Sequence, residues 1–297
     1  MKKKVYIALA ADNNYSGYAA VVIMSAIKSL NKNWNLDITI FDGGIEYENK
    51  ARIKSICVEN SCILRFYDVS CDIGYEELPT MEHWSKAMYY RLSVGDAIPI
   101  SAPRVIYLDC DVLVTKSLHY LFEMDLEGKL LGAVENPDSS RLCELGIKKS
   151  KKYFNSGVLL IDMLAWRKNK LKNRALEICY DYREKLISPD QDILNILYDG
   201  KVKFLSFNWN MQVSMFRNKK YWHALENFDG IIHFTTNVKP WHVDDPHPRA
   251  CDFRKIAEEI NVSTGGKELS LLKNIKYYKR YLSNYFLFLL FIKITRY

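Results

Sequence analysis

Apolar runs that alternate with helical patterns predict an α/β protein with a mostly parallel central sheet. The chain has 297 residues, of which 48% are hydrophobic and 26% charged, so it is long and apolar enough to bury a large core. The apolar, β-rich runs are residues 5–11, 38–41, 63–67, 105–108, 131–134 and 158–161. Strands that alternate with helices form parallel sheets with helices on both faces, and ligands bind beyond the carboxyl ends of such strands.

Helical periodicity fills the intervals between these runs. Residues 18–30 carry apolar side chains at positions 22, 23, 26, 27 and 30, and residues 47–58 repeat that spacing at 53, 56 and 57. Residues 171–187 predict a surface helix, and the next helix is expected to begin with Ser188 as its N-cap and Pro189 at its first position. Aromatic-rich irregular chain is expected from 204 to 247, and the glycine pair at 265–266 predicts the end of a globular domain at residues 1–266.

The beginning of the chain combines a basic start with a short apolar run, as a signal peptide does. The run is at the short limit for export, and we interpret it as the first β-strand. Seven cysteines, odd in number and without a Cys-x-x-Cys pair, predict neither a disulfide framework nor a zinc ribbon. Together these features indicate a cytoplasmic protein.

Residues 267–297 carry most of the net charge. They hold seven basic residues and one acid, a net of +6 out of +7, which leaves 35 basic and 34 acidic residues in the first 266. Beyond residue 269 the pattern is that of a basic amphipathic helix, and its apolar run at 285–292 is too short to span a bilayer. Such a helix predicts a peripheral protein on the anionic inner face of the cell membrane; the alternative is a helix packed on the protein or on a partner chain. The nearly neutral body lacks recognisable nucleic-acid recognition elements, so no nucleic acid is expected as a partner.

Two carboxylates, Asp109 and Asp111, follow the apolar run at 105–108. Alternation along an extended chain places both on one side, and like charges held beside a hydrophobic run need a compensating cation. His233 follows another apolar pair, and a mixed nitrogen and oxygen site suits Mn²⁺ better than Ca²⁺ or Mg²⁺. Lys239 is a flexible cation suited to a phosphate. Taken alone, an Asp-x-Asp pair is common by chance, and His233 is better explained as a core histidine.

Taken together, five segments resemble glycosyltransferase family 8 in the order in which that family has them, over residues 5–250, and most of all its bacterial lipopolysaccharide galactosyl- and glucosyltransferases. The segments are residues 10–15 (AADNNY), 107–113 (YLDCDVL), 154–162 (FNSGVLLID), 190–195 (DQDILN) and 233–241 (HFTTNVKPW). The resemblance implies a Rossmann-like GT-A fold and an enzyme that moves galactose or glucose from a UDP-sugar to a glycan acceptor, such as lipopolysaccharide, lipooligosaccharide or another cell-surface or lipid-linked glycan. It also implies retention of the anomeric configuration and a Mn²⁺ cofactor, with Mg²⁺ as the alternative ion.

The resemblance implies a role for each matched residue. Asp109, Asp111 and His233 would hold the metal, and Gln191 with Asp190 would lie at the reacting anomeric carbon. The donor would be bound by Ala10, Ala11, Asp12, Asn14, Tyr15, Arg91, Asp109, Cys110, Asn155, Asp190 and Lys239, with Tyr15 on the uracil and Lys239 on the diphosphate. His83 falls where a close relative has an acceptor-side histidine.

Two positions depart from the family pattern. Thr236 replaces a frequent glycine near the diphosphate, and Asn136 stands where some relatives have an acceptor-binding aspartate. The acceptor is therefore not predictable from the sequence.

The expected chemistry is stabilisation of the departing UDP by the metal and Lys239, while the sugar passes through an oxocarbenium-like state. Because the matched residue Gln191 is an amide rather than a carboxylate, front-side transfer is favoured over double displacement. Removal of either Asp109 or Asp111 should abolish transfer with little effect on folding. The alternatives are a haloacid-dehalogenase-type phosphatase and a non-catalytic, membrane-bound interaction protein.

Overall fold

The computed structural model describes residues 2–71, 86–137, 140–216, 228–242, 245, 247 and 249–265. The predicted amphipathic segment at 267–297, the domain boundary at 266 and the acceptor-side candidate His83 lie outside these residues. Within the described ranges, none of the helices has the length and apolar character needed to cross a bilayer.

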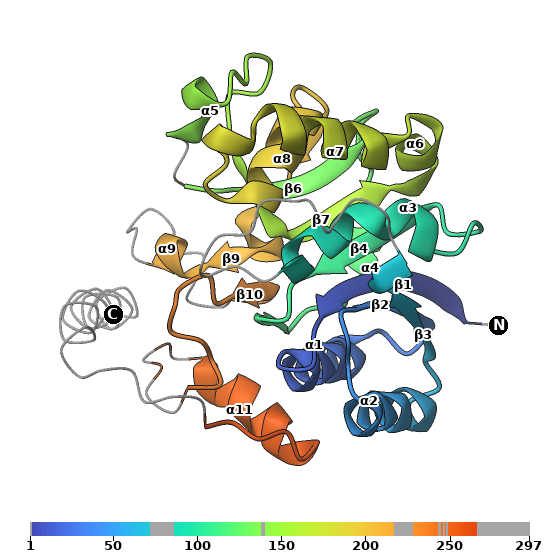
Figure 1. Ribbon diagram of the computed structural model, residues 1–297. Helices are drawn as coiled ribbons and strands as arrows, with labels where there is room; N and C mark the ends of the chain where they lie inside the picture. The colour runs from blue at the N-terminus through green and yellow to red at the C-terminus, as the bar shows by residue number, and fades with distance from the viewer. Residues whose placement is uncertain are drawn as a thin grey trace.

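The core of the structure is a mixed sheet with the strand order β3-β2-β1-β4-β7-β6-β8 (Figure 1). Strands β1, β2, β3 and β4 pair in parallel, and so do β6 and β8, whereas β7 runs antiparallel to both of its neighbours. A second, smaller sheet has the order β5-β10-β9. The expected mostly parallel sheet is therefore confirmed, with one antiparallel strand in its interior.

The elements have the following bounds: β1 Lys3–Ala11, α1 Ser16–Ser29, β2 Trp34–Asp42, α2 Tyr47–Glu59, β3 Ile63–Asp68, η1 Val69–Cys71, η2 Lys86–Ser93, α3 Val94–Ala97, β4 Arg104–Leu108, β5 Val112–Val114, α4 His119–Phe122, β6 Leu131–Glu135, α5 Arg141–Glu144, β7 Phe154–Asp162, α6 Met163–Lys168, α7 Leu171–Asp181, η3 Arg183–Lys185, α8 Pro189–Leu197, β8 Val202–Phe204, η4 Phe207–Trp209, β9 Met211–Gln212, α9 Val213–Phe216, β10 Ile231–His233 and α11 Ala250–Glu259, where η marks a 3₁₀ helix.

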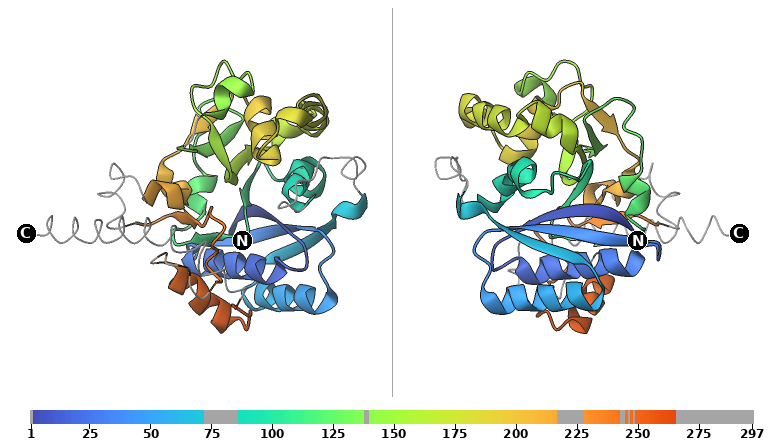
Figure 2. Two further views of the ribbon diagram at one scale, coloured as in Figure 1. Left: turned by 60° about the vertical axis from the view of Figure 1, so that its left-hand side comes forward. Right: turned by 90° about the vertical axis from the view of Figure 1, so that its right-hand side faces the viewer.

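Helices cover both faces of the large sheet, and each face has its own hydrophobic core. Helices α1, α2 and α11 lie on one side, and α6 and α7 lie on the other (Figures 1 and 2). Side chains along β4 alternate between the two cores: Ile106 and Leu108 pack on the first, and Val105 and Tyr107 pack on the second. Burial on both faces explains why the strands are continuous apolar runs in the sequence.

Two of the sequence-based boundaries are wrong. The helix expected at 171–187 ends at Asp181 and is followed by the separate 3₁₀ turn Arg183–Lys185. The segment expected to be irregular at 204–247 contains η4, β9, α9 and β10. Strands of two and three residues are too short to show alternation, so the pairing of β10 with β5 and of β9 with β10 defines them rather than local pattern.

The start of α8 is fixed by the fully buried carboxylate of Asp192. Its Oδ2 accepts hydrogen bonds from the backbone N–H groups of Ile187 (2.8 Å) and Ser188 (3.1 Å), and its Oδ1 accepts from the Tyr153 hydroxyl at 2.5 Å. The Arg141 guanidinium supplies the counter-charge at 2.9 Å. Pro189 occupies the first turn as predicted, but the Ser188 side chain makes no capping bond. Asp192, one turn into the helix, instead anchors the backbone that leads into α8.

We predict that Asp192→Ala lowers the free energy of unfolding by about 3 kcal/mol, because it leaves the Arg141 charge and two backbone donors without this partner. Urea unfolding measures the change. The matched control Asp181→Ala removes an exposed carboxylate at the end of α7 and should change stability by less than about 0.5 kcal/mol. A loss below about 1 kcal/mol for Asp192→Ala would contradict the anchoring role.

Candidate active site

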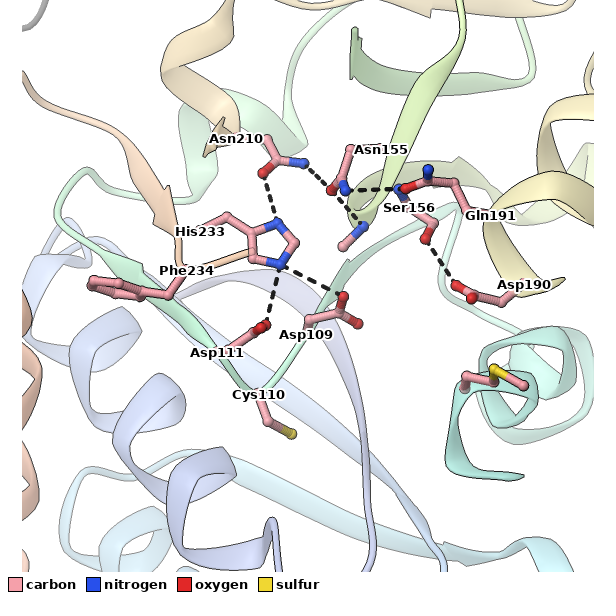
Figure 3. Close-up of polar contacts among 12 residues, drawn as sticks. Asp109, Cys110, Asp111, Asn155, Ser156, Asp190, Gln191, Asn210, His233 and Phe234 are labelled. Carbon is pink, nitrogen blue, oxygen red and sulfur yellow. Dashed lines mark hydrogen bonds and ion pairs between the residues drawn. The ribbon is translucent and has the colours of Figure 1, made fainter. Parts of the chain in front are cut away.

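Three metal-ligating side chains meet where the two sheets join. Asp109 and Asp111 follow β4, and His233 ends β10, which pairs with β5 so that His233 lies opposite Val112. One ligand atom from each residue lies within 4.8 Å of the others. His233 Nε2 is 3.1 Å from Asp111 Oδ1 and 3.8 Å from Asp109 Oδ2 (Figure 3). Cys110 points away from the cluster, so the alternation predicted for the two carboxylates is confirmed.

The donor set and its surroundings fit a divalent cation. Two carboxylates and an imidazole nitrogen form a mixed oxygen and nitrogen site of the kind that Mn²⁺ accepts. The opposite ring nitrogen of His233, Nδ1, is 3.0 Å from Asn210 Oδ1, which directs Nε2 toward the carboxylates. A Cβ at Gly157 would overlap the His233 ring and lie 2.6 Å from Asp109 Oδ2, so the cluster has room only because residue 157 is glycine. The Asp-Asp-His cluster can therefore bind a metal ion.

Lys239 lies against the cluster from the following loop. Its ammonium group contacts Asp111 Oδ2 at 2.6 Å and the Phe234 carbonyl at 2.9 Å. Burial alone would raise the pKa of Asp111, but the charge of Lys239 and the adjacent His233 ring hold that pKa well below its ordinary value. Asp111 is therefore ionised at neutral pH, as a metal ligand must be.

A buried cation, Arg91, connects the cluster to a second group of carboxylates and amides. Its guanidinium is 2.9 Å from Asp109 Oδ1 and 3.1 Å from Asp190 Oδ2, and it donates to the Ser156 carbonyl at 2.8 Å. Burial lowers the pKa of Arg91, but the two carboxylates outweigh that effect and raise it above its ordinary value. Burial raises the pKa of Asp190, and the Arg91 charge offsets only part of this shift.

Amide side chains from β7 and α8 continue the network. Gln191 Oε1 accepts from the Ser156 N–H at 3.1 Å and from Asn155 Nδ2 at 3.0 Å, and Ser156 Oγ donates to Asp190 Oδ2 at 2.8 Å. Figure 3 shows this group beside the metal-ligand cluster. The structure therefore brings together the predicted residues of three segments that are far apart in the sequence.

The loop after β1 borders the same site. The Cys110 thiol contacts the Ala10 carbonyl at 3.2 Å, and the Ala11 carbonyl accepts from the Gly43 N–H at 2.9 Å. Asp12 Oδ1 accepts from the Tyr15 N–H at 3.0 Å, which fixes the turn. Asn14 is exposed. The Tyr15 ring is 41% exposed and packs edge-on against Trp241 with 5.8 Å between the ring centroids, which leaves an aromatic surface at this rim.

Sequence reasoning did not select three residues that the structure places in the site. Ser156 and Gly157 lie in the segment 154–162 that resembles the family, directly after the selected residue Asn155. Ser156 also donates to Asp190, which was selected as well. Asn210 had no such signal, because it lies between η4 and β9 in the segment expected to be irregular. The two positions that depart from the family pattern make local contacts: Thr236 Oγ1 donates to the Val238 carbonyl, and the Asn136 N–H donates to the Tyr153 carbonyl.

Comparisons with known proteins identify the family of this chain. The model of the family described as "Glycosyl transferase family 8" matches residues 6–245. General stress protein A of Bacillus subtilis is 31% identical over 259 residues, which cover 82% of this chain and 90% of that protein. Lipopolysaccharide 1,2-glucosyltransferase of Escherichia coli K12 is 27% identical over 287 residues, 93% of this chain and 83% of that protein. The crystal structure of the galactosyltransferase LgtC in complex with donor and acceptor sugar analogs superimposes with a TM-score of 0.76 at 28% identity and covers 89% of this chain and 98% of that one.

We predict that Asp109→Asn and Asp111→Asn both weaken Mn²⁺ binding by at least about tenfold, because each removes one of two anionic ligands. Both variants should also lose stability. Asp109→Asn deprives the buried Arg91 of a counter-charge, and Asp111→Asn removes the carboxylate that Lys239 contacts at 2.6 Å, so each should cost about 1–3 kcal/mol of unfolding free energy, and the expectation of little effect on folding is revised for both.

Titration calorimetry with Mn²⁺ in the presence of UDP, together with urea unfolding, measures both effects. Asp252→Asn, a half-exposed carboxylate on α11, is the control and should change neither. Unchanged Mn²⁺ affinity in both site variants would contradict the metal assignment.

Proposed function

The chain belongs to glycosyl transferase family 8, and from this membership we propose that it transfers galactose or glucose from a UDP-sugar to a glycan acceptor, with Mn²⁺ as cofactor and with retention of the anomeric configuration. The observation that carries the proposal is the single network in which Arg91 joins the Asp-Asp-His cluster to Asp190 and its neighbouring amides. A nucleotide-sugar has a diphosphate beside a hexose, and the network has a part that can bind a metal ion, with Lys239 and Arg91 against it, beside a part rich in hydrogen-bonding groups.

The metal-binding part suits the diphosphate. Asp109, Asp111 and His233 would hold the ion, which supplies Lewis-acid stabilisation to the departing UDP when bound. The Lys239 ammonium, now 2.6 Å from Asp111, is the nearby cation available to the phosphate oxygens. The exposed Tyr15 ring would stack on the uracil at the rim.

The hydrogen bonds of Asp190 and Gln191 support front-side transfer rather than a covalent intermediate. Gln191 Oε1 already accepts from two donors, and Asp190 Oδ2 accepts from Ser156 Oγ and from Arg91. An amide oxygen is a weak nucleophile, and Asp190 Oδ2 is paired with a cation, so neither favours a covalent intermediate. Without such an intermediate, the UDP oxygen on the same face of the sugar would accept the proton of the incoming acceptor hydroxyl. Asp190 and Gln191 then orient the hexose and stabilise the oxocarbenium-like state.

For the acceptor we propose a lipopolysaccharide-type or other cell-surface glycan. The support comes from relatives named as lipopolysaccharide 1,2-glucosyltransferase and lipopolysaccharide 1,3-galactosyltransferase. Asn136, which stands where some relatives have an acceptor-binding aspartate, is the candidate for setting which acceptor is used.

A panel of nucleotide-sugars, with hydrolysis as the readout, tests the donor. We expect Mn²⁺-dependent release of UDP from UDP-galactose or UDP-glucose and a loss of hydrolysis with excess chelator. These two donors differ at one hydroxyl. A site with few hydrogen bonds to the sugar should therefore hydrolyse one of them about 10–1000-fold faster than the other at most. A preference for GDP- or CMP-sugars would refute the assignment of Asp12 and Tyr15 to uridine, and binding without hydrolysis of any donor would favour the non-catalytic alternative.

We further propose that residues 267–297 hold the enzyme on the anionic inner face of the cell membrane, where a lipid-linked glycan would be presented. The support is the concentration of charge, +6 of +7, beside the short apolar run at 285–292. Every residue proposed to bind the donor precedes residue 267.

Deletion of residues 269–297 should therefore abolish binding to vesicles with anionic lipids and leave UDP-sugar hydrolysis unchanged. For the full chain, vesicle binding should weaken with added salt, because the attraction of Lys and Arg is screened over about 8 Å at physiological ionic strength. Sedimentation with anionic and with neutral vesicles measures the difference. Loss of hydrolysis and aggregation of the shortened chain would show that the segment is part of the core.

A further inference from the structure

Asn210 bridges the two parts of the site. It is fully buried between η4 and β9, and its side chain contacts one residue of each part. Its Oδ1 is 3.0 Å from His233 Nδ1, and its Nδ2 donates to Asn155 Oδ1 at 2.8 Å. Asn155 in turn donates to Gln191 Oε1 at 3.0 Å. Three amides thus form a continuous chain from the imidazole to α8 (Figure 3).

Two backbone N–H groups determine which way each amide points. The Ser156 N–H faces Gln191, and the Gly157 N–H faces Asn155, at 3.1 and 3.0 Å. A backbone N–H is always a donor, so each of these amides must turn its oxygen toward β7. The Asn155 oxygen faces the Gly157 N–H, so only the Asn155 NH₂ group can donate to Gln191 Oε1.

The orientation of Asn155 determines that of Asn210, which contacts His233. Asn155 Oδ1 is an acceptor, so Asn210 must present its NH₂ group to it and its own oxygen to His233. An oxygen beside Nδ1 requires a proton on Nδ1, which leaves the lone pair of the neutral ring on Nε2. Nε2 is the atom that faces Asp109 and Asp111. Two backbone amides of β7 therefore determine the tautomer of an imidazole on another sheet.

We infer that Asn210 is a positioning residue that couples metal binding by His233 to the orientation of Asn155 and Gln191 on the donor-sugar side. The inference rests on the proposed function for the identity of the donor. The link between Asn210 and the metal ligand does not depend on it.

Two substitutions separate the two bonds of Asn210. Asn210→Ala removes both, so Mn²⁺ affinity should fall about 10–100-fold and kcat should fall as well. Asn210→Asp keeps an acceptor for His233 but faces Asn155 Oδ1 with a second oxygen. Its Mn²⁺ affinity should stay at or above the wild-type value, while kcat for UDP-hexose hydrolysis falls at least about tenfold with less change in KM.

Calorimetry with Mn²⁺ and UDP measures the affinity, hydrolysis kinetics at saturating Mn²⁺ give kcat and KM, and thermal unfolding verifies that each variant is folded. Ser117→Ala is the matched control. It removes a buried acceptor of the Asn31 N–H near the amino end of β2, away from the site, and should leave affinity and kcat unchanged. If Asn210→Ala does not fold, Asn210→Asp alone tests the inference, because its Mn²⁺ affinity should be kept while its kcat falls.

Wild-type Mn²⁺ affinity and kcat in Asn210→Ala would overturn the inference. So would equal losses of Mn²⁺ affinity in Asn210→Ala and Asn210→Asp, because the acceptor would then have no role. Absence of UDP-hexose hydrolysis by the wild-type chain would instead refute the proposed function, and the affinity comparison would still test the contact between Asn210 and His233.

Discussion

The buried guanidinium of Arg91 is the charge around which the candidate site is organised. A cation removed from water is costly unless carboxylates and hydrogen-bond acceptors replace the lost hydration. The carboxylates are those of Asp109 after β4 and Asp190 in α8, and the Ser156 carbonyl of β7 is an acceptor. The centroid of the Tyr107 ring lies 4.5 Å from the guanidinium carbon. These groups come from separate elements of the fold. Because all of them surround the charge of Arg91, the Asp-Asp-His cluster and the amide network lie together in one site.

The antiparallel direction of β7 makes this meeting possible. In a parallel pair the carboxyl ends of both strands lie at the same edge, but β7 is antiparallel to β4, so its amino end lies beside the carboxyl end of β4. Leu108 pairs with Val158, and the Asp109 N–H donates to the Gly157 carbonyl at 2.9 Å. The residues 155–157 thereby reach the metal ligands, and the glycine leaves room for the His233 ring.

The sequence predicted what depends on local pattern and missed what depends on tertiary pairing. The strands at 5–11 and 105–108, both helices that follow β1 and β2, and the mostly parallel α/β sheet were predictable because buried strands and amphipathic helices have distinct periods. The candidate metal ligands were selected by residue type and joined into one site by a resemblance that spans distant segments. Strands β9 and β10 and the role of Asn210 were not predictable, since pairs of two or three residues and a single buried amide leave no periodic signal.

The position of the cluster at the junction of the two sheets has a consequence for stability. Asp109 continues a strand of the large sheet, whereas Asp111 and His233 are held by the pairing of β5 with β10, in which the Phe234 N–H donates to the Asp111 carbonyl at 3.0 Å. Lys239 and Arg91 balance the two carboxylates from outside the cluster. A cation bound by all three ligands would join both sheets directly, and because the unfolded chain cannot present the ligands together, its binding energy would add to the stability of the folded state. Metal binding and the relative placement of the two sheets are therefore expected to be thermodynamically linked.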